Sequence, residues 1–318
     1  MPSDPHDALE IDVAVVGAGP AGLAAGIHLA RLGLEHRVFE RDEPGGLLCS
    51  AGLVECYPGF PGGIQARELV TAMVSQARGL GVHIAPGEVT DLSWSGAGYQ
   101  LQMGTQCWLA QAVILATGTT PRLLDPKLFD GALPTERVHH GTASLPRGLV
   151  GSRIWVSGGG DAAFDSALQL LERGATVQLA MRGQRPKALA LLVQRAQECG
   201  VQIHPDTTLS SLRLRPDGLE LALATAEGPV THGADHVVIC HGRVPDHLLW
   251  HRLASPAARG PRQVESHYPG LFMAGDLVRG ECRYAAVAAG DGLRCAKLAE
   301  LHLERYRARP LPPSSGSP

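Results

Sequence analysis

The stretch that decides the fold is IDVAVVGAGPAGLAAGIHLARLG, at residues 11–33. An apolar run with strand character leads into a glycine-rich turn, and apolar residues at helical spacing continue to Gly33. The same order recurs at residues 152–174, in SRIWVSGGGDAAFDSALQLLERG. Each copy predicts a strand, a turn and a helix, which together begin a βαβ unit that binds a dinucleotide. The chain is therefore predicted to be an α/β protein with two Rossmann-like domains.

The first turn has the sequence GAGPAG and is followed by a strand, EHRVFE, that ends in an acid. Glycines permit a tight turn and let backbone amides approach a pyrophosphate at the helix N-terminus, where the helix dipole favours negative charge. The acid at the end of the next strand suits the two hydroxyls of a ribose. The predicted contacts of this turn are Gly17, Gly19, Pro20, Ala21, Gly22 and Glu40.

The second turn, GGGDAA, stands in the same strand–turn–helix setting, but the next strand ends in AMRGQRPK and not in an acid. Arg182, Arg185 and Lys187 are placed to face a 2′-phosphate, which an acid would repel. This favours NADPH over NADH, and a solvated basic loop is the alternative interpretation. The predicted contacts of the nicotinamide nucleotide are Gly158, Gly160, Asp161, Ala162, Ala163, Arg182 and Lys187.

Composition excludes several classes of partner. The chain has 318 residues, a net charge of −3 and an aromatic content of 4%, which argue against general nucleic-acid binding. No apolar run reaches the roughly 18 residues of a membrane span, and we do not expect the polar N-terminus to be a signal peptide. Seven scattered cysteines indicate reduced thiols, so we expect a cytoplasmic protein. No residue pattern predicts a metal site.

The position of the second unit predicts an insertion. The first dinucleotide unit is completed only after the second ends, so we expect three-layer ββα domains with the second inserted into the first. Residues 11–122 and 245–308 are predicted to form the first domain, and residues 123–244 the second. The polar residues 1–10 and the Pro/Ser-rich residues 309–318 are expected to be disordered.

Four further motifs carry a resemblance to a known family. They are GGLLCSAGLVECYPGFP at 45–61, VILATGTTPR at 113–122, ICHGRVPD at 239–246, and PGLFMAGDLVRGECRYAAVAAGDG at 269–292. In this order, and with both glycine turns, they make the chain similar to the low-molecular-weight thioredoxin reductases from about residue 11 to residue 305. The second and third motifs resemble the family's crossings between its two domains.

The resemblance implies FAD in the first domain and NAD(P)H in the second. It also implies a homodimer and a domain rotation that alternately brings nicotinamide or substrate to the flavin. Asp276 matches an aspartate at the ribityl–phosphate portion of FAD, and residues 283–285 match a segment along the isoalloxazine. Leu47 stands where the family has a glutamine, which removes a hydrogen bond to the ring. The further FAD contacts that the resemblance implies are Gly46, Leu47, Cys56, Thr117, Gly118, Gly275, Asp276, Arg283, Tyr284 and Ala285.

The segment HHGTAS, at residues 139–144, departs from the family. The family's CxxC redox pair falls on Gly141 and Ser144 of this chain. A serine hydroxyl forms no disulfide and supplies no thiolate, so the usual route of thioredoxin reduction is excluded unless other cysteines replace the pair. His139 and His140 flank the segment, and either could donate a proton near the flavin or to a substrate. A histidine in a surface loop is the plainer explanation.

Cys49 and Cys56 offer a different redox pair. Both lie in the predicted FAD domain, and Cys56 matches a family position near the flavin. They could work as a dithiol, as cysteines do in another branch of flavin disulfide reductases. Alternatively, they are small buried side chains of the flavin pocket. His241, at the return crossing, is expected to be structural.

The leading prediction is an FAD-dependent NAD(P)H oxidoreductase of the class II pyridine nucleotide-disulfide type without the active-site disulfide. Reduced flavin would pass electrons directly to a small molecule, to oxygen, or to a ferredoxin- or flavodoxin-like protein. Ferredoxin–NADP reductases that resemble thioredoxin reductases also lack the CxxC pair, although they usually carry a C-terminal extension. Three alternatives stay open: a dithiol–disulfide oxidoreductase using Cys49 and Cys56, a flavoenzyme that uses no nicotinamide, and a non-catalytic, redox-responsive flavin-binding protein.

Overall fold

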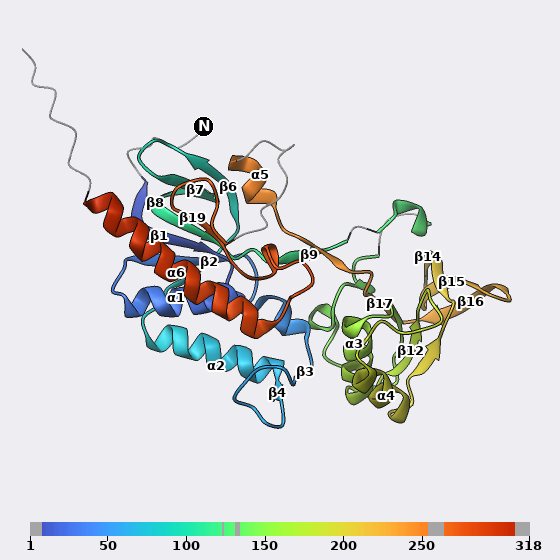
Figure 1. The fold of residues 1–318 in the computed structure, drawn as a ribbon. Helices are drawn as coiled ribbons and strands as arrows, with labels where there is room; N and C mark the ends of the chain where they lie inside the picture. The colour runs from blue at the N-terminus through green and yellow to red at the C-terminus, as the bar shows by residue number, and fades with distance from the viewer. Residues whose placement is uncertain (1–7, 123, 131–133, 254–263, 309–318) are drawn as a thin grey trace, which may run out of the picture.

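The chain folds into two lobes. The computed structural model describes residues 8–122, 124–130, 134–253 and 264–308. The first and last parts of the chain form one lobe and the middle part forms the other (Figure 1). Residues 1–7 and 309–318, for which disorder is expected, lie outside the described part. Strand β1 already begins at Leu9, inside the expected disordered segment, because Leu9 pairs with Trp108 of the neighbouring strand.

The first lobe is built on a sheet in the order β5-β2-β1-β8-β7-β6, with β19 parallel to β8. Its strands are β1 (Leu9–Val16), β2 (His36–Glu40), β5 (Ile84–Pro86), β6 (Val89–Trp94), β7 (Tyr99–Met103), β8 (Gln106–Leu115) and β19 (Leu271–Met273). Its helices are α1 (Pro20–Arg31), α2 (Ala66–Gly79), α5 (Leu248–Leu253) and α6 (Ala285–Arg307). Strands β1, β2, β5, β8 and β19 are parallel, whereas β6 and β7 form an antiparallel arm.

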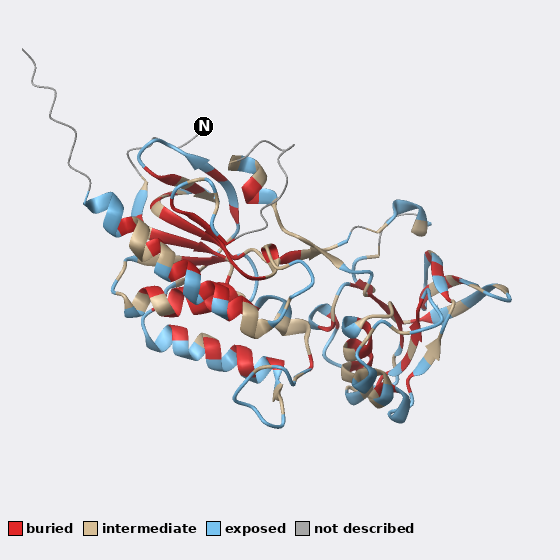
Figure 2. Ribbon diagram, in the orientation of Figure 1, coloured by how far each residue is buried: buried red, intermediate tan, exposed pale blue. Residues whose placement is uncertain are grey.

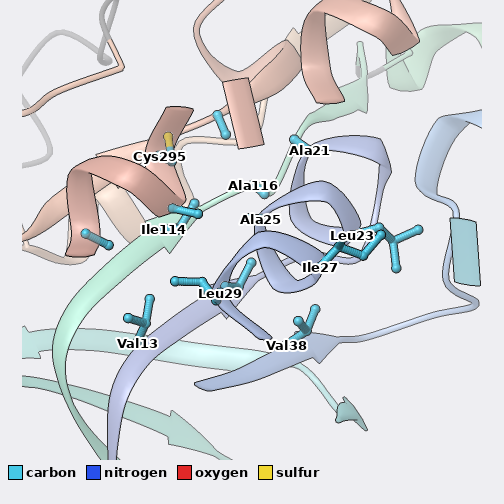
Figure 3. Packing of buried hydrophobic residues seen from close by; sticks show 14 of the residues in the cluster. Val13, Ala21, Leu23, Ala25, Ile27, Leu29, Val38, Ile114, Ala116 and Cys295 are labelled. Atoms are coloured by element: carbon cyan, nitrogen blue, oxygen red, sulfur yellow. The ribbon is translucent and has the colours of Figure 1, made fainter. Parts of the chain in front are cut away.

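Alternation along β1 divides its side chains between two cores, because successive residues of a strand point to opposite faces. Val13 and Val15 face α1, α2 and α6, while Ala14 and Val16 face the β6–β7 arm and α5. Figure 3 shows the helix side of this core, with Leu29 of α1 near Val13 and Val38. Burial on both faces explains why the strand is a continuous apolar run.

The second lobe repeats the plan with a parallel sheet in the order β10-β17-β11-β12-β13. Helices α3 and α4 cover one face of it, and an antiparallel meander covers the other. The sheet strands are β10 (Val138–His139), β11 (Arg153–Ser157), β12 (Thr176–Ala180), β13 (Gln202–His204) and β17 (His236–Ile239). The remaining elements are α3 (Asp161–Glu172), α4 (Ala190–Glu198), β14 (Thr208–Arg215), β15 (Gly218–Thr225) and β16 (Gly228–Ala234). The predicted three-layer ββα organisation is therefore confirmed.

Two short antiparallel strands, β9 (Thr119–Pro121) and β18 (Arg243–Pro245), link the lobes. The chain leaves the first lobe after β8 and returns before α5 and β19, which confirms the inserted arrangement. Four 3₁₀ turns and a small hairpin complete the described structure: η2 (Gly46–Ser50), η3 (Pro126–Leu128), η4 (Thr142–Ser144), η5 (Gly275–Leu277), β3 (Leu53–Val54) and β4 (Ile64–Gln65). Figure 2 shows the buried central strands of both lobes and the exposed outer faces of their helices. Within the described ranges, no helix is both long enough and apolar enough to cross a membrane.

Candidate dinucleotide-binding and redox site

The first glycine turn lies between β1 and α1 and leaves no space for a side chain at Gly17 or at Gly22. Gly17 has a φ of +103°, and a Cβ on it would lie 2.4 Å from the Ala116 carbonyl oxygen. A Cβ on Gly22 would lie 1.7 Å from the carbonyl oxygen of Gly17. The helix therefore begins directly against the turn. No side chain caps its N-terminus at Gly19, and Pro20 follows, so its first amides are free to bind an anion.

The loop that contains η2 lies beside this turn. Gly45 donates its N–H to the Ala18 carbonyl oxygen at 2.9 Å, and a Cβ on Gly46 would lie 3.2 Å from the Cα of Gly19. The next residue, Leu47, is 45% exposed. The structure thus brings the GGLL segment to the glycine turn, as the resemblance implies, and leaves an apolar side chain open beside it.

Glu40 ends β2 with a buried carboxylate next to the same turn. Oε2 accepts the N–H of Ala18 at 2.6 Å, and Oε1 accepts the N–H of Asp42 at 2.9 Å. Each carboxylate oxygen can accept a further hydrogen bond, so the group can still bind ribose hydroxyls. The predicted acid therefore also holds the turn in shape.

The closing motif brings η5 and the start of α6 to the same end of the sheet. Burial raises the pKa of Asp276, while the guanidinium groups of Arg283 and Arg243 act in the opposite direction. Arg283 donates from Nη1 to the Arg243 carbonyl oxygen at 3.3 Å, but its buried Nε has no hydrogen-bond partner. Tyr284 is 53% exposed and precedes α6, which starts at Ala285. This N–H is therefore available to donate to a polar ligand.

The two segments that connect the lobes are hydrogen-bonded to each other just after the end of β8. Thr117 donates its hydroxyl to the Asp246 carbonyl oxygen at 2.9 Å, and the Asp246 N–H donates to the Gly118 carbonyl oxygen at 3.0 Å. Arg243 bonds to both oxygens of Thr119, at 2.9 Å and 2.6 Å. Thr117 and Gly118, predicted as FAD contacts, thus also fasten the interdomain link. Arg243 also stabilises this link. No sequence pattern indicated this role, because its partner Thr119 lies on another strand.

The second glycine turn repeats the first in the other lobe. A Cβ on Gly158 would lie 2.6 Å from the Cys240 carbonyl oxygen, and Gly160 begins α3 without a side-chain cap. Ala163 is buried in the core below the turn, whereas Ala162 is exposed. The carboxylate of Asp161 accepts the N–H of Leu189 at 2.8 Å, so it is engaged with the loop that follows β12.

That loop carries the basic residues predicted to face a 2′-phosphate. Arg182, Arg185 and Lys187 are all exposed. The backbone N–H of Lys187 donates to the Gly159 carbonyl oxygen at 2.7 Å, which ties the loop to the glycine turn. Positive charge therefore lies beside the second dinucleotide turn, and no acidic side chain ends β12.

His139 lies in a buried network in the second lobe. Its Nδ1 is 3.1 Å from Ser144 Oγ, and its Nε2 is 3.1 Å from His236 Nδ1. Burial, with smaller contributions from His236 and His140, lowers its pKa to about 4. Both ring nitrogens are engaged and the ring is neutral near pH 7, so His139 is poorly placed to donate a proton to a substrate. His236 was missed from sequence because it lies on a strand far along the chain.

His140 and Ser144 are exposed, unlike His139. Burial lowers the pKa of His140, and the nearby Arg243 acts in the same direction. Ser144 donates its hydroxyl to the Gly141 carbonyl oxygen at 3.2 Å. Of the two predicted histidines, His140 is the one that the structure leaves open near the interdomain link.

All seven cysteines lie in the described part of the chain, and each is a free thiol. Cys49 is half-buried in η2, with its Sγ 3.6 Å from the Pro44 carbonyl oxygen. Burial raises its pKa, and Glu43 adds to the effect. Cys56 is exposed. A raised pKa lowers the thiolate fraction of Cys49, which disfavours it as a nucleophile.

These features fit two dinucleotides, one in each lobe. Each turn offers helix amides without a side-chain cap beside a backbone that no Cβ obstructs. In the first lobe, the unpartnered Nε of Arg283 is a further donor. Among the described residues, no group of three or more histidine, cysteine or acidic side chains could hold a metal ion.

Comparisons with known proteins agree with this geometry. The model of the family described as pyridine nucleotide-disulphide oxidoreductase matches residues 11–292. The ferredoxin–NADP reductase of Ignicoccus hospitalis is 30% identical over 296 residues, which cover 87% of this chain and 93% of that protein. The NADPH-dependent thioredoxin reductase 3 of Arabidopsis thaliana is 29% identical over 313 residues. That match covers 93% of this chain but only 58% of the Arabidopsis protein.

Solved structures show the same fold. The thioredoxin reductase of Lactococcus lactis, in its FR conformation, superposes with a TM-score of 0.82 at 24% sequence identity. The superposition covers 93% of this chain and 99% of the Lactococcus chain.

Proposed function

The chain belongs to the pyridine nucleotide-disulphide oxidoreductase family, and we propose that it is an FAD-dependent oxidoreductase that takes electrons from NADPH and delivers them to an acceptor other than thioredoxin. The observation that carries this proposal is a contrast within the chain. Both glycine turns are present, but by the resemblance to thioredoxin reductases Gly141 and Ser144 match the positions of the relay cysteines. Ser144 Oγ is engaged with His139 and with the Gly141 carbonyl oxygen.

The first lobe supplies groups for each part of an FAD. When bound, FAD would accept a hydride and release its electrons to the acceptor. The amides at the start of α1 would bind the pyrophosphate, and Glu40 would bind the ribose hydroxyls. Asp276 and Arg283 would hold the portion near the flavin, where the Arg283 Nε lacks a partner. Leu47 would keep water from that edge because its side chain is apolar.

The second lobe is proposed to bind NADPH in preference to NADH. The exposed Arg182, Arg185 and Lys187 would pair with a 2′-phosphate, and the glycine turn would bind the pyrophosphate. Two relatives support this preference, because the Arabidopsis protein is named as NADPH-dependent and the Ignicoccus protein as a ferredoxin–NADP reductase.

Among acceptors, a ferredoxin-like protein has the most direct support, because the Ignicoccus relative matches over 93% of its length. A small molecule and oxygen are the other candidates. By likeness to thioredoxin reductases we also propose a homodimer, which light scattering after size-exclusion chromatography would test.

Anaerobic stopped-flow spectroscopy tests the proposed function. The yellow protein is mixed with NADPH or with NADH, and the reduced protein is then mixed with oxygen, ferredoxin or thioredoxin. We expect faster bleaching by NADPH, reoxidation by one of the first two acceptors, and none by thioredoxin. A protein that binds no flavin, or that reduces thioredoxin efficiently, would contradict the proposal. A flavin that no nicotinamide bleaches would favour the non-catalytic alternative.

The dithiol alternative makes a separate prediction. Replacing Cys49 and Cys56 together by serine would abolish disulfide turnover if they formed the redox pair. Because burial raises the pKa of Cys49, we expect any turnover and the flavin reduction rate to stay unchanged in this variant. Loss of turnover with intact flavin reduction would instead assign the relay to these two thiols.

A further inference from the structure

We propose that Gly141, Thr142, Asp165 and Gln169 form a docking contact with residues 50–55, and that this contact positions the two nucleotide-binding lobes for electron transfer. The inference rests on the proposed function, because it gives a role to the segment that would otherwise hold the redox pair. On this proposal the segment contacts the opposite lobe and sets the position of the two lobes, and it carries no electrons itself.

Hydrogen bonds join the two lobes at this contact. Thr142 Oγ1 lies 3.0 Å from the carbonyl oxygen of Ser50, and Gln169 Nε2 donates to the same oxygen at 3.1 Å. The N–H of Gly52 donates to Asp165 Oδ2 at 3.0 Å, and Gln169 Nε2 holds that carboxylate oxygen from its own helix, also at 3.0 Å. The two segments thus share one hydrogen-bonded network around Gln169.

An ion pair borders the network. Glu55 accepts hydrogen bonds from both terminal nitrogens of Arg195, at 2.7 Å and 2.8 Å, in a bidentate arrangement. Glu55 belongs to the first lobe, and Arg195 belongs to α4 of the second. The pair is exposed, so it contributes orientation more than stability.

The contact leaves little room for a side chain at one glycine on each side. A Cβ on Gly141 would lie 2.7 Å from Ser50 Oγ and 3.0 Å from Ser50 Cβ. A Cβ on Gly52 would lie 2.6 Å from Asp165 Oδ1 and 3.0 Å from Gln169 Cγ. In both cases the opposite lobe, and not the local backbone, fills the space of the side chain. Gly141 is extended, with a φ of 176° that any residue adopts.

This arrangement explains why the first position of the redox pair is a glycine here. A cysteine at position 141 would collide with Ser50 while the lobes are docked. Hydride transfer needs reacting atoms about 3–3.5 Å apart, so misplaced lobes would slow the transfer. Each nucleotide would still bind normally, because each has its own turn in its own lobe.

The test uses the FAD-loaded protein and three readouts: the small-angle scattering profile, the affinity for NADP⁺, and the rate of flavin reduction by NADPH. Gly141→Leu should expand the molecule and slow flavin reduction by about tenfold or more, with NADP⁺ affinity and flavin content unchanged. The matched control is Gly148→Leu, in the same loop, where a Cβ would meet nothing within 4 Å. It should behave as the wild type.

A second-site variant guards against a simple folding defect. Gly141→Ala should give a milder form of the same changes. Ser50→Gly removes both atoms that the new Cβ would meet but keeps the carbonyl oxygen that accepts the two bonds. The double variant should therefore regain the scattering profile and reduction rate of Ser50→Gly alone.

The outcomes separate this inference from the proposed function. If Gly141→Leu and Gly141→Ala leave the scattering profile and the rate unchanged, or if Ser50→Gly fails to rescue Gly141→Ala, the docking contact is wrong. If NADPH does not reduce the wild-type flavin, the proposed function fails, and the scattering profiles still decide whether the contact holds the lobes.

Discussion

Single residues show how neighbours change what a side chain can do. Glu40 was predicted from its place after the glycine turn, and it also satisfies two backbone amides. His139 was predicted from its place in the segment that departs from the family, but burial leaves its ring neutral and His236 occupies its Nε2. The position of Glu40 follows from a local motif, whereas the state of His139 depends on a strand far along the chain.

Glu40→Gln is predicted to weaken FAD binding. The amide offers one oxygen where the carboxylate offers two, so one of the two N–H donors would face an NH₂ group. The loss of a charged hydrogen bond, about 1.5–3 kcal/mol, corresponds to roughly tenfold to a hundredfold weaker binding. Fluorescence titration with FAD measures the change. The exposed Glu35 supplies a matched control, since Glu35→Gln should retain wild-type affinity.

Acid is predicted to destabilise the protein through His139. Its folded pKa of about 4 lies below the ordinary value, so the unfolded chain binds more protons between the two. The stabilisation is complete above about pH 6.5 and is lost as the pH falls towards 4, on the order of 3 kcal/mol in all and about 2 kcal/mol by about pH 5. Urea unfolding at about pH 7.5 and about pH 5 measures this slope. His139→Gln should make this slope shallower, and an unchanged slope would count against the assignment.

At the scale of elements, helix α1 packs closely against the glycine turn on one side and against α6 on the other. A Cβ on Gly22 would meet the carbonyl oxygen of Gly17 at 1.7 Å, and a Cβ on Gly292 would meet that of Ala21 at 2.0 Å. The helix whose amides are proposed to bind FAD is thus held on two sides by backbone contacts. The need for a glycine at position 22 is predictable from the sequence motif. The need for a glycine at position 292 arises from the packing of α6 against α1.

Two substitutions two residues apart on α6 test this clamp. Gly292→Ala should push α6 away from α1, destabilise the protein by about 1–3 kcal/mol and lower its flavin content. Gly290→Ala points into open space on the same helix and should be neutral or stabilise by about 0.5–1 kcal/mol. Thermal unfolding and the flavin absorbance of the purified variants measure both effects. Equal effects of the two substitutions would exclude the clamp.

At the scale of the whole molecule, two lobes with separate cores are joined by the short pair β9–β18. The cores of the first lobe contain no residues of the second lobe's sheet, and the reverse also holds. The described contacts between lobes are mainly polar and include those of residues 50–55 with η4, α3 and α4. Such an arrangement allows the lobes to unfold as separate units.

Calorimetry is predicted to resolve two unfolding transitions that respond to different ligands. FAD should raise the midpoint of the first lobe, and NADP⁺ that of the second, because a ligand stabilises only the unit that binds it. At a hundred times its Kd each ligand should add about 2.7 kcal/mol to its own lobe. A single transition that moves equally with both ligands would mean that the lobes unfold together.

The amino-acid sequence by itself determined the two glycine turns and the insertion of one dinucleotide unit into the other. Each glycine turn is a local feature, because its hydrophobic periodicity and turn residues lie within one short segment. The insertion follows from the order of such segments along the chain. Only the tertiary structure decided that Ser50 occupies the space beside Gly141 and that His236 holds His139. The residues that meet in these contacts lie far apart in the sequence. Ser50 and Thr142 are separated by 92 positions, and His139 and His236 by 97. No pattern in a single sequence specifies which distant side chains meet, because the packing of the folded lobes selects them.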